Sequence, residues 1–385
     1  VFEPNKSYIR LMAYNWQLPE WPGFSYDLGP CEKDLFAFAE RVGRVDGLLE
    51  SLPEGTQTET IVELMVSEAI KTSEIEGEIL SREDVMSSIR NHLGLAIPKQ
   101  SVHGQRAEGA ATLMIAVREH FAKPLTEETL FDWHTLLRQG DRRIRKGAWR
   151  RHEAPMQVVS GPVGRKKIHF EAPPSSRVPK EMKAFVRWFN DTGPNGKKEI
   201  ASPPVRSALA HLYFESIHPF EDGNGRIGRA ISEKALSQGV GRPILMSLSA
   251  AIEKNKAAYY AALKAAQRTN EVTGWIAYFT QTCLQAQTQA EELVRFAFQK
   301  ARFFDRFSAA LNARQAEALR RMLEEGPDGF KGSMTAKKYM AITQASKATA
   351  TRDLQELGAL GVLVQEGGGR NTHYAINLDG PKAAG

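Results

Sequence analysis

Residues 217–229 read IHPFEDGNGRIGR. The segment interrupts the helical spacing of the apolar residues around it, and it gathers one histidine, two acids, three glycines and two arginines about a single phenylalanine. A lone histidine or a lone Gly-Asn-Gly turn is most simply explained as polar surface structure. That explanation does not account for a base, a carboxylate, a glycine-rich turn and two guanidinium groups occurring together, so the segment indicates a functional loop.

The loop is expected to lie between two helices. Apolar residues recur at three- and four-residue steps before it and predict a helix over 204–217. The proline after His218 disfavours the helical conformation at that residue, so the helix should end there. Gly223 and Gly225 can adopt positive φ and bring backbone N–H groups close to a ligand. A second helix is expected to begin near Arg226, and a glycine-rich turn at a helix N-terminus is typical of a phosphate site.

The charged side chains of the loop suit phosphate chemistry. Arg226 and Arg229 are three residues apart in the following helix, so both can reach one phosphate chain. Asp222 would face the same phosphates, which is favourable only where a cation such as Mg²⁺ lies between them. His218 can accept a proton at neutral pH and so activate a hydroxyl group. Phe220 is expected to be buried and to hold the loop in place.

The same segment resembles the active-site motif of the Fic family. The family pattern is H-x-F-x-(D/E)-G-N-G-R-x-x-R, and residues 218–229 match it at every fixed position. The resemblance implies a mainly α fold with a helical core and a β-hairpin flap. It implies binding of ATP with Mg²⁺ and transfer of AMP to a Ser, Thr or Tyr hydroxyl of a target protein or of the chain itself. It also makes a homodimer one of the states to expect.

Carried over by position, the resemblance assigns roles within the loop. His218 would be the general base that deprotonates the target hydroxyl, and Asp222 would hold Mg²⁺. Four residues would cradle the α- and β-phosphates: Gly223, Asn224, Gly225 and Arg226. Arg229 would bind the γ-phosphate. In-line attack on the α-phosphate then expels pyrophosphate, with positioning and charge neutralisation supplying most of the rate.

Two further segments agree with the resemblance. Residues 156–171 contain two β-prone runs around a Gly-Pro turn and predict a hairpin where the family has its flap. Its strand would pair with a target segment through Gln157, Val158, Val159 and Ser160, although a plain surface hairpin is the alternative. The segment 255–263 is similar to the family's segment over the nucleotide base. Asn255, Tyr259 and Tyr260 would then contact adenine or ribose, with core packing as the alternative for the two tyrosines.

A short pattern before the core suggests control of the site. Residues 72–77 read TSEIEG and resemble the family's inhibitory pattern (S/T)-x-x-x-E-(G/N), with Thr72, Glu76 and Gly77 at the fixed positions. Glu76 brought against Arg229 would form a charge-assisted pair and occupy the guanidinium needed for the γ-phosphate. The alternative is a solvated glutamate at a helix end before a C-cap glycine.

We predict four parts along the chain. They are an N-terminal helical region over 1–100 that carries the inhibitory pattern, a catalytic core over 101–290, a connecting helix over 291–310 and a winged helix-turn-helix domain over 311–385. Apolar spacing predicts helices over the following approximate ranges: 31–50, 58–75, a helix opened by 81–84, 104–121, 126–138, a helix from 179, 204–217, 226–238, 250–266, 272–307, 311–324, 335–341 and 346–357.

The last part has the outline of a winged helix. Three helices are followed by a predicted hairpin over 362–376. Leu354 and Leu357 would face its core, whereas Lys347, Thr349, Thr351 and Arg352 could face a major groove, with Arg370 on the wing. Residues 331–370 hold six basic residues against three acidic ones. This balance leaves two partners open, duplex DNA and another protein chain.

Composition limits the remaining classes. The chain has 385 residues, 42% hydrophobic and 25% charged, with a formal net charge of +6, which permits a polyanionic partner without requiring one. It has no apolar stretch of membrane-span length and no signal-peptide pattern, and Cys31 and Cys283 lie far apart. We therefore expect a cytoplasmic enzyme without a membrane partner. Two other functions stay open: a DNA-binding transcriptional regulator whose core senses ATP, and other phosphate-transfer or de-AMPylation chemistry.

Overall fold

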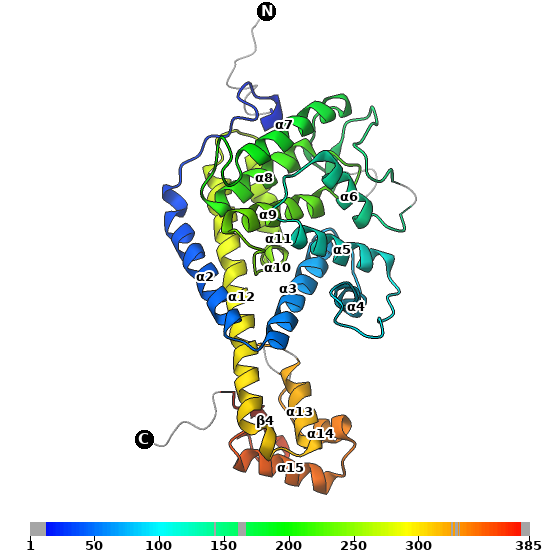
Figure 1. The fold of residues 1–385 in the computed structure, drawn as a ribbon, viewed down its shortest axis with the longest axis vertical. Helices are drawn as coiled ribbons and strands as arrows, with labels where there is room; N and C mark the ends of the chain where they lie inside the picture. Colours follow the sequence, from blue (N-terminus) through cyan, green and yellow to red (C-terminus); the bar gives the residue numbers. More distant parts are fainter. Residues whose placement is uncertain are drawn as a thin grey trace, which may run out of the picture. The chain divides into compact units, whose positions relative to one another are not determined.

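The computed structural model describes residues 13–141, 144–160, 167–324, 326–327, 330 and 332–378. Among these residues the protein is mainly α, with two small antiparallel sheets of two strands each, which confirms the predicted fold class (Figure 1). The chain divides into two compact units. Unit 1 comprises Val1–Gly43 and Ile61–Ala290, and unit 2 comprises Arg44–Thr60 and Glu291–Gly385.

The elements of the first part of the chain are α2 (Glu32–Glu50), α3 (Glu54–Ile75), α4 (Arg82–His92), α5 (Gln105–Glu119), α6 (Glu127–Leu137), β1 (Gln157–Ser160), β2 (Lys167–Glu171), α7 (Val178–Asp191), α8 (Pro203–Ile217), α9 (Asn224–Val240), α10 (Leu248–Lys254), α11 (Lys256–Ala266) and α12 (Thr273–Phe307). Short 3₁₀ helices occur at Asn15–Gln17, Gly29–Cys31 and Ser175–Arg177. Helices α2, α3 and α12 contribute residues to both units.

The core of unit 1 surrounds α8. Fourteen of the fifteen residues of this helix, Pro204–Ile217, are buried, and α9 packs along it (Figure 1). Phe185 of α7 meets Tyr213 of α8 edge to face, with ring centroids 5.2 Å apart. Full burial of a phenylalanine side chain such as Phe185 stabilises the fold by about 1.5–3 kcal/mol. The loop after α8 is therefore attached to a helix that is almost entirely buried in the unit.

The predicted helix over 250–266 is wrong in one respect, because the chain breaks at Asn255. This residue has φ −141° and ψ 57°, outside the helical range, and separates α10 from α11. Its side chain accepts a hydrogen bond from the backbone N–H of Ala258 at 3.2 Å and so caps α11. The apolar spacing continues across the break, which is why periodicity alone did not reveal it.

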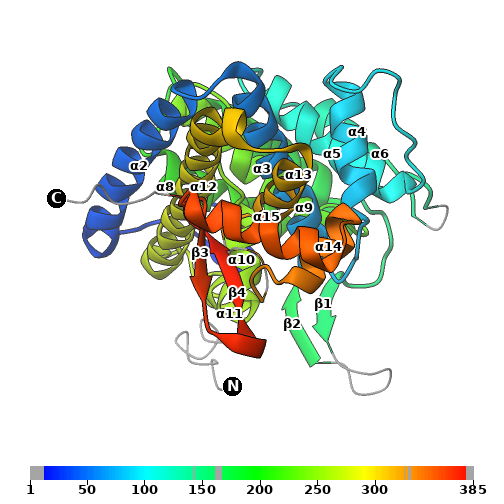
Figure 2. The same ribbon diagram turned by 90° about the horizontal axis from the view of Figure 1, so that it is seen from below.

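Unit 2 contains the end of α12 and then α13 (Ala313–Leu323), α14 (Ala336–Thr343), α15 (Lys347–Ala359), β3 (Leu363–Glu366) and β4 (His373–Ile376), with 3₁₀ turns at Ser308–Ala310 and Gly369–Asn371. The β3–β4 hairpin lies next to α15 (Figure 2). Leu354 and Leu357 are buried in a separate core, as predicted. Ser346 caps α15 by accepting a hydrogen bond from the N–H of Thr349.

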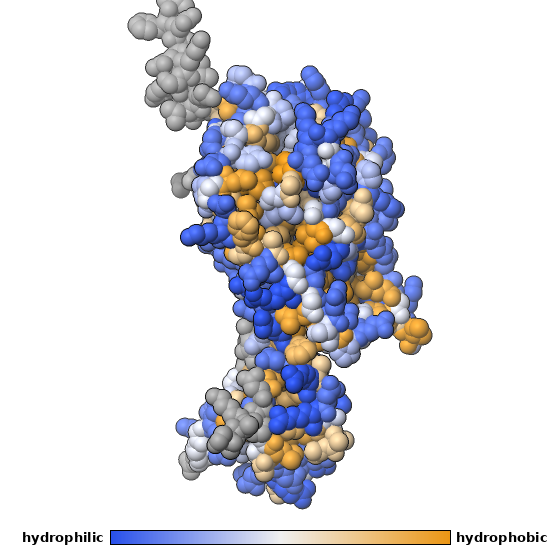
Figure 3. Space-filling view, turned by 60° about the vertical axis from the view of Figure 1, so that its left-hand side comes forward, coloured by the Kyte–Doolittle hydropathy of each residue, from blue (hydrophilic) through white to orange (hydrophobic). Residues whose placement is uncertain are grey.

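The surface is mainly hydrophilic on the face shown in Figure 3, with apolar side chains gathered in separate patches. Among the described residues, the most exposed large apolar side chains are Ile97, Ile79 and Phe36. No helix within the described ranges is both long and apolar enough to cross a membrane.

Candidate active site

The loop after α8 begins with a left-handed histidine. His218 has φ 51° and ψ 60° and ends α8, with its N–H bonded to Phe214 O at 2.9 Å. A left-handed conformation costs a non-glycine residue about 1–2 kcal/mol, so the surroundings must hold it. The guanidinium of Arg150 does so. Its Nε donates to the carbonyl of His218 at 2.8 Å, and its Nη2 donates to that of Ile217 at 3.3 Å.

The rest of the loop is closed by Asn224. Its amide Nδ2 donates to Phe220 O and its Oδ1 accepts from Phe220 N, both at 2.8 Å. Phe220 is buried as predicted and stacks on the ring of His134 at 4.1 Å. Helix α9 then begins directly after Gly223, which has φ 88°. The Asn224 side chain thus fixes the shape of the loop through its own hydrogen bonds to Phe220. The first N–H groups of α9 are the ones available to an anion.

His134 supports the loop from α6 and was not found from the sequence. Burial lowers the pKa of His134 to about 4, so the ring is neutral at physiological pH. Its Nδ1 accepts from Gly147 N at 3.0 Å, which leaves Nε2 to donate to the backbone carbonyl of Asp222 at 3.1 Å. The position of Asp222 is therefore fixed by a fully paired imidazole.

Arg229 is held by the segment that resembles the inhibitory pattern. Its side chain is 1% exposed. Its Nε donates to Thr72 Oγ1 at 2.7 Å, and its Nη2 donates to Thr72 O at 2.8 Å and Glu76 Oε1 at 2.7 Å. Burial acts to lower the pKa of Arg229, but Glu76, Tyr259 and Glu215 together outweigh burial, so the pKa is raised. Within the described part of the chain, Nη1 has no hydrogen-bond partner, so this buried donor remains for a ligand.

Glu76 also lies against the first turn of α9. A Cβ atom placed on Gly225 would clash with Glu76 Oε1. The free N–H groups and the positive end of the dipole at a helix N-terminus favour an anion there. The Glu76 carboxylate therefore occupies surroundings that suit a phosphate group.

Glu78 makes a second contact of the same kind, which was not expected from the sequence. Its Oε2 pairs with Nη1 of Arg226, and its Oε1 pairs with Nη1 of Arg106 at 2.9 Å. The Arg226 side chain is 4% exposed; burial lowers the pKa of its guanidinium, and Glu78 acts in the opposite direction. Both motif arginines are thus paired with carboxylates from residues 76–78. The acidic residues on either side of Gly77, Glu76 and Glu78, were the sequence feature that could have indicated this second contact.

The Asp222 carboxylate lies near one of the motif arginines, with its Oδ1 4.0 Å from Nη2 of Arg226. The Asp222 side chain is 49% exposed, and its Oδ2 pairs with Nη1 of Arg138 at 2.9 Å. Arg138, which also pairs with Asp141, was not expected from the sequence. The residues described contain no cluster of three or more His, Cys, Asp or Glu that could hold a metal. A divalent cation would therefore need phosphate oxygens and water beside Asp222, which is the usual manner of Mg²⁺ binding.

The three residues expected near the nucleotide base lie in different surroundings. Tyr259 is buried, and its hydroxyl is 2.7 Å from Nε2 of His211, so core packing describes its place. Tyr260 is 39% exposed, and its hydroxyl donates to Ile75 O at 3.5 Å. Asn255 is exposed and caps α11. Only Tyr260 and Asn255 are open to solvent.

The predicted hairpin is present as β1 and β2. Its register pairs Gln157 with Glu171 and Val159 with Ile168, and a bulge separates Val158 from Val159. Val159 and Ile168 are exposed. The side chain of Ser160 and the whole tip, residues 161–166, lie outside the described residues.

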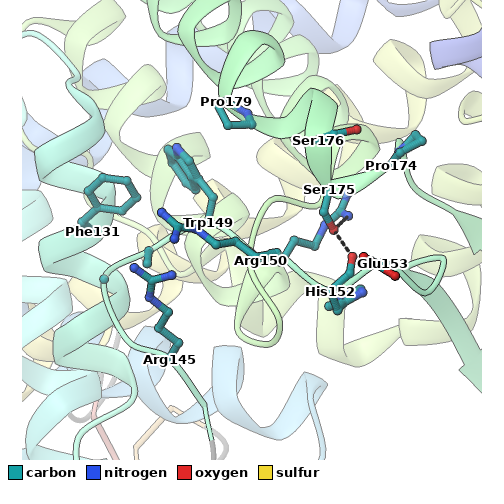
Figure 4. A pocket seen from close by; sticks show the side chains of 13 residues that line it. Phe131, Arg145, Trp149, Arg150, His152, Glu153, Pro174, Ser175, Ser176 and Pro179 are labelled. Carbon is teal, nitrogen blue, oxygen red and sulfur yellow. Dashed lines mark hydrogen bonds between the residues drawn. The ribbon is translucent and has the colours of Figure 1, made fainter.

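The loop before the hairpin borders an open pocket of about 640 Å³ (Figure 4). Ser175 Oγ donates to the carbonyl of His152 across it and accepts from Nη1 of Arg150. Burial lowers the pKa of Arg150 to about 10, so the guanidinium keeps its charge at neutral pH. Arg150 connects this loop to the backbone of His218, a role that its sequence position does not reveal.

Comparisons with known proteins agree with this geometry. Residues 124–236 match the Fic/DOC family, and residues 14–95 match a domain of unknown function, DUF4172. The chain is 36% identical over 62 residues to a probable protein adenylyltransferase of Aquifex aeolicus, covering 16% of this chain and 18% of that protein. It is 30% identical over 90 residues to a protein adenylyltransferase of Caenorhabditis elegans, covering 23% and 16%. The chain thus spans less than a fifth of the length of each of these relatives.

A solved structure shows the same fold. A Fic family protein from Desulfovibrio desulfuricans superimposes with a TM-score of 0.50 at 20% identity, covering 89% of this chain and 96% of that chain. The loop at 218–229 lies inside the part that matches the Fic/DOC family. The resemblance drawn from the loop is therefore confirmed for the central part of the chain.

Proposed function

We propose, from the Fic/DOC family match of residues 124–236, that the chain is an autoinhibited protein adenylyltransferase. It transfers AMP from ATP to a Ser, Thr or Tyr hydroxyl of a protein. The observation that carries this proposal is the pair of buried guanidinium groups, Arg226 and Arg229, on the first turns of α9 beside His218. Buried arginines at a helix N-terminus recognise phosphate groups, and a nearby imidazole can take the proton of an attacking hydroxyl.

Different residues of the loop would bind different parts of ATP. The backbone of Gly223, Asn224 and Gly225, together with Arg226, holds the α- and β-phosphates, and Arg229 holds the γ-phosphate. Asp222 would bind Mg²⁺, which when present neutralises phosphate charge. His218 removes the proton as the target oxygen bonds to the α-phosphorus. The bond from that phosphorus to the bridging oxygen breaks, and pyrophosphate leaves.

The target protein would be aligned by the hairpin. An extended target segment adds to the edge of β1, over Gln157–Ser160, through main-chain hydrogen bonds. The exposed cross-strand pair of Val159 and Ile168 gives this segment an apolar surface to contact. The target hydroxyl is then presented to His218.

Residues 72–78 would inhibit the enzyme in this conformation. Glu76 neutralises the arginine assigned to the γ-phosphate, and Glu78 neutralises Arg226. ATP must displace carboxylates that are already in place, which lowers its affinity and disfavours the productive pose. Movement of the end of α3 would release both arginines together.

Labelling with ATP that carries radioactive phosphorus at the α-position tests the activity. We expect the wild-type protein, incubated with Mg²⁺ and a cell lysate, to transfer label covalently to itself or to a lysate protein. A chelator should abolish the transfer. Label that is equal with and without the chelator would contradict the assignment of Asp222. Absence of label even after Glu76 is replaced by glycine would contradict the activity.

Replacing Glu78 by glutamine should tighten binding of Mg²⁺–ATP by about threefold to tenfold, because Arg226 loses a charged partner. Calorimetric titration of the wild type, both single variants at 76 and 78, and the double variant measures the effect. Contacts within one segment are rarely additive, so we expect the two changes to be coupled. Glu74→Gln, on the same segment but paired only with Lys71 in the described contacts, is the matched control. An unchanged Kd in Glu78→Gln would show that the contact of Glu78 with Arg226 does not weaken ATP binding.

A second candidate function concerns unit 2. Lys347, Thr351 and Arg352 are exposed on α15, whereas Leu354 and Leu357 of the same helix are buried. This arrangement suits insertion of the helix into a major groove. We expect unit 2 to bind a fluorescently labelled DNA duplex. Replacing a residue that contacts a DNA phosphate should reduce the magnitude of the slope of log K against log salt concentration by about 0.9. Lack of binding at low salt would favour a protein partner for unit 2.

A further inference from the structure

Glu215 lies one helical turn before His218 at the end of α8. Its side chain is 6% exposed, and its Oε2 is 3.5 Å from Nδ1 of His218. In the described part of the chain neither Nδ1 of His218 nor Oε1 of Glu215 has a hydrogen-bond partner. A buried carboxylate and a buried ring nitrogen that face each other and lack other partners require an explanation, because such groups are normally satisfied.

The surroundings keep Glu215 ionised. Burial raises its pKa, but contacts with His218, His211 and Arg229 outweigh burial, and the pKa of Glu215 is lowered from its ordinary value. His211 is buried, which lowers its pKa, and its two ring nitrogens face Ser232 Oγ at 3.0 Å and Tyr259 OH at 2.7 Å. Glu215 therefore faces His218 as a carboxylate at neutral pH.

The packing of α9 leaves room for this carboxylate. A Cβ atom on Gly228 would lie 2.5 Å from Glu215 Oε1 and 3.3 Å from Cε1 of His211. Any larger residue at 228 would displace the acid from His218. The backbone carbonyl of Glu215 accepts from Gln267 Nε2 at 3.3 Å, so main-chain contacts hold this turn while the carboxylate stays free.

We infer that Glu215 is a positioning residue for His218, an inference that rests on the proposed adenylyl transfer. Glu215 accepts the hydrogen bond of Nδ1–H, which fixes the imidazole as the tautomer whose lone pair is on Nε2. The target hydroxyl gives its proton to Nε2 as its oxygen bonds to the α-phosphorus, and the imidazolium formed is stabilised by the carboxylate. The Nδ1–Oε2 separation of 3.5 Å is expected to shorten when the ring becomes charged.

A conservative variant separates this role from a structural one. We expect Glu215→Gln, made in a Glu76→Gly background, to lower the plateau rate by about 10- to 100-fold, as removal of a group that orients a general base should. Arg229 and Tyr259, which also face this cluster, are unchanged in the comparison.

An unchanged rate would overturn the inference, as would a loss of rate that Glu215→Asp does not recover in part. Glu215→Asp should recover part of the rate if the charge is what matters. Glu221→Gln, an exposed acid of the same loop, is the matched control and should behave as its parent. Thermal unfolding of each variant shows whether the fold is retained.

A second measurement does not depend on activity. Nitrogen NMR of labelled histidine in the ATP-free protein distinguishes a proton on Nδ1 from one on Nε2. We expect His218 to carry it on Nδ1 in the parent, and Glu215→Gln to reduce that population. The same tautomer mixture in both proteins would contradict the inference even if AMP transfer occurs. A change in tautomer without any AMP transfer would instead contradict the proposed function alone.

Discussion

Replacing Glu76 by glycine is expected to raise the rate of AMP transfer by about 10- to 100-fold, the effect of removing one charge-assisted hydrogen bond of about 1.5–3 kcal/mol from the binding site. The bond is that from Nη2 of Arg229 to Oε1 of Glu76, at 2.7 Å. Removing the carboxylate leaves the guanidinium, which is fully buried, with Thr72 as its remaining partner. A γ-phosphate can then take the vacated place beside Gly225.

The measurement is the initial rate of α-label transfer at saturating Mg²⁺. Glu74→Gly is the matched control, because Glu74 lies two residues away and pairs with Lys71 at 2.6 Å rather than with the motif. It introduces a glycine into the same segment without removing the carboxylate that pairs with Arg229. Equal rates for Glu76→Gly and the wild type would show that Glu76 does not inhibit.

Replacing His218 by alanine is expected to lower AMP transfer by about 100- to 10,000-fold, the usual contribution of a general base. The prediction is best measured in the Glu76→Gly background, where the rate before the change is high. Arg150 bonds to the backbone of His218 rather than its ring, so these contacts survive in the variant. ATP binding should therefore remain while the transfer step fails.

His120→Ala is the control for this variant. His120 is exposed at the end of α5. Its hydrogen bonds within the described part of the chain use its backbone, including the carbonyl that accepts from Lys234 Nζ at 2.7 Å. It should transfer AMP at the parent rate. A His218→Ala protein that retains more than about a tenth of the parent rate would contradict the role of general base.

The loop was predictable because its chemistry is contiguous in the sequence. Residues 218–229 contain the base, the carboxylate, the glycines and the arginines within one loop and the first turns of one helix. These residues could therefore be found without knowing any contact between distant parts of the chain. The burial of Phe220 was expected from the loop itself, and the structure shows it. The contact of Glu76 with Arg229 was expected from the resemblance of residues 72–77 to the family's inhibitory pattern, and the structure shows this contact too.

The supporting residues could not be found in this way, because each acts from another element. Arg150 precedes the hairpin, His134 lies on α6, and Arg106 lies on α5, yet all three reach the loop or its inhibitory segment. Their sequence neighbours carry no sign of these contacts, which depend on how the helices pack. Glu215 is near the motif but outside its fixed positions, and only the geometry shows that its carboxylate faces His218.

The central claim is transfer of AMP, and the position of the retained phosphorus tests it most directly. The Glu76→Gly protein is incubated with Mg²⁺ and ATP labelled at either the α- or the γ-phosphate, beside the same protein carrying His218→Ala. We predict that the α-label becomes covalently attached to protein, that the γ-label does not, and that the His218→Ala protein retains neither. Attachment of the γ-label, or α-labelling that persists without His218, would contradict the account.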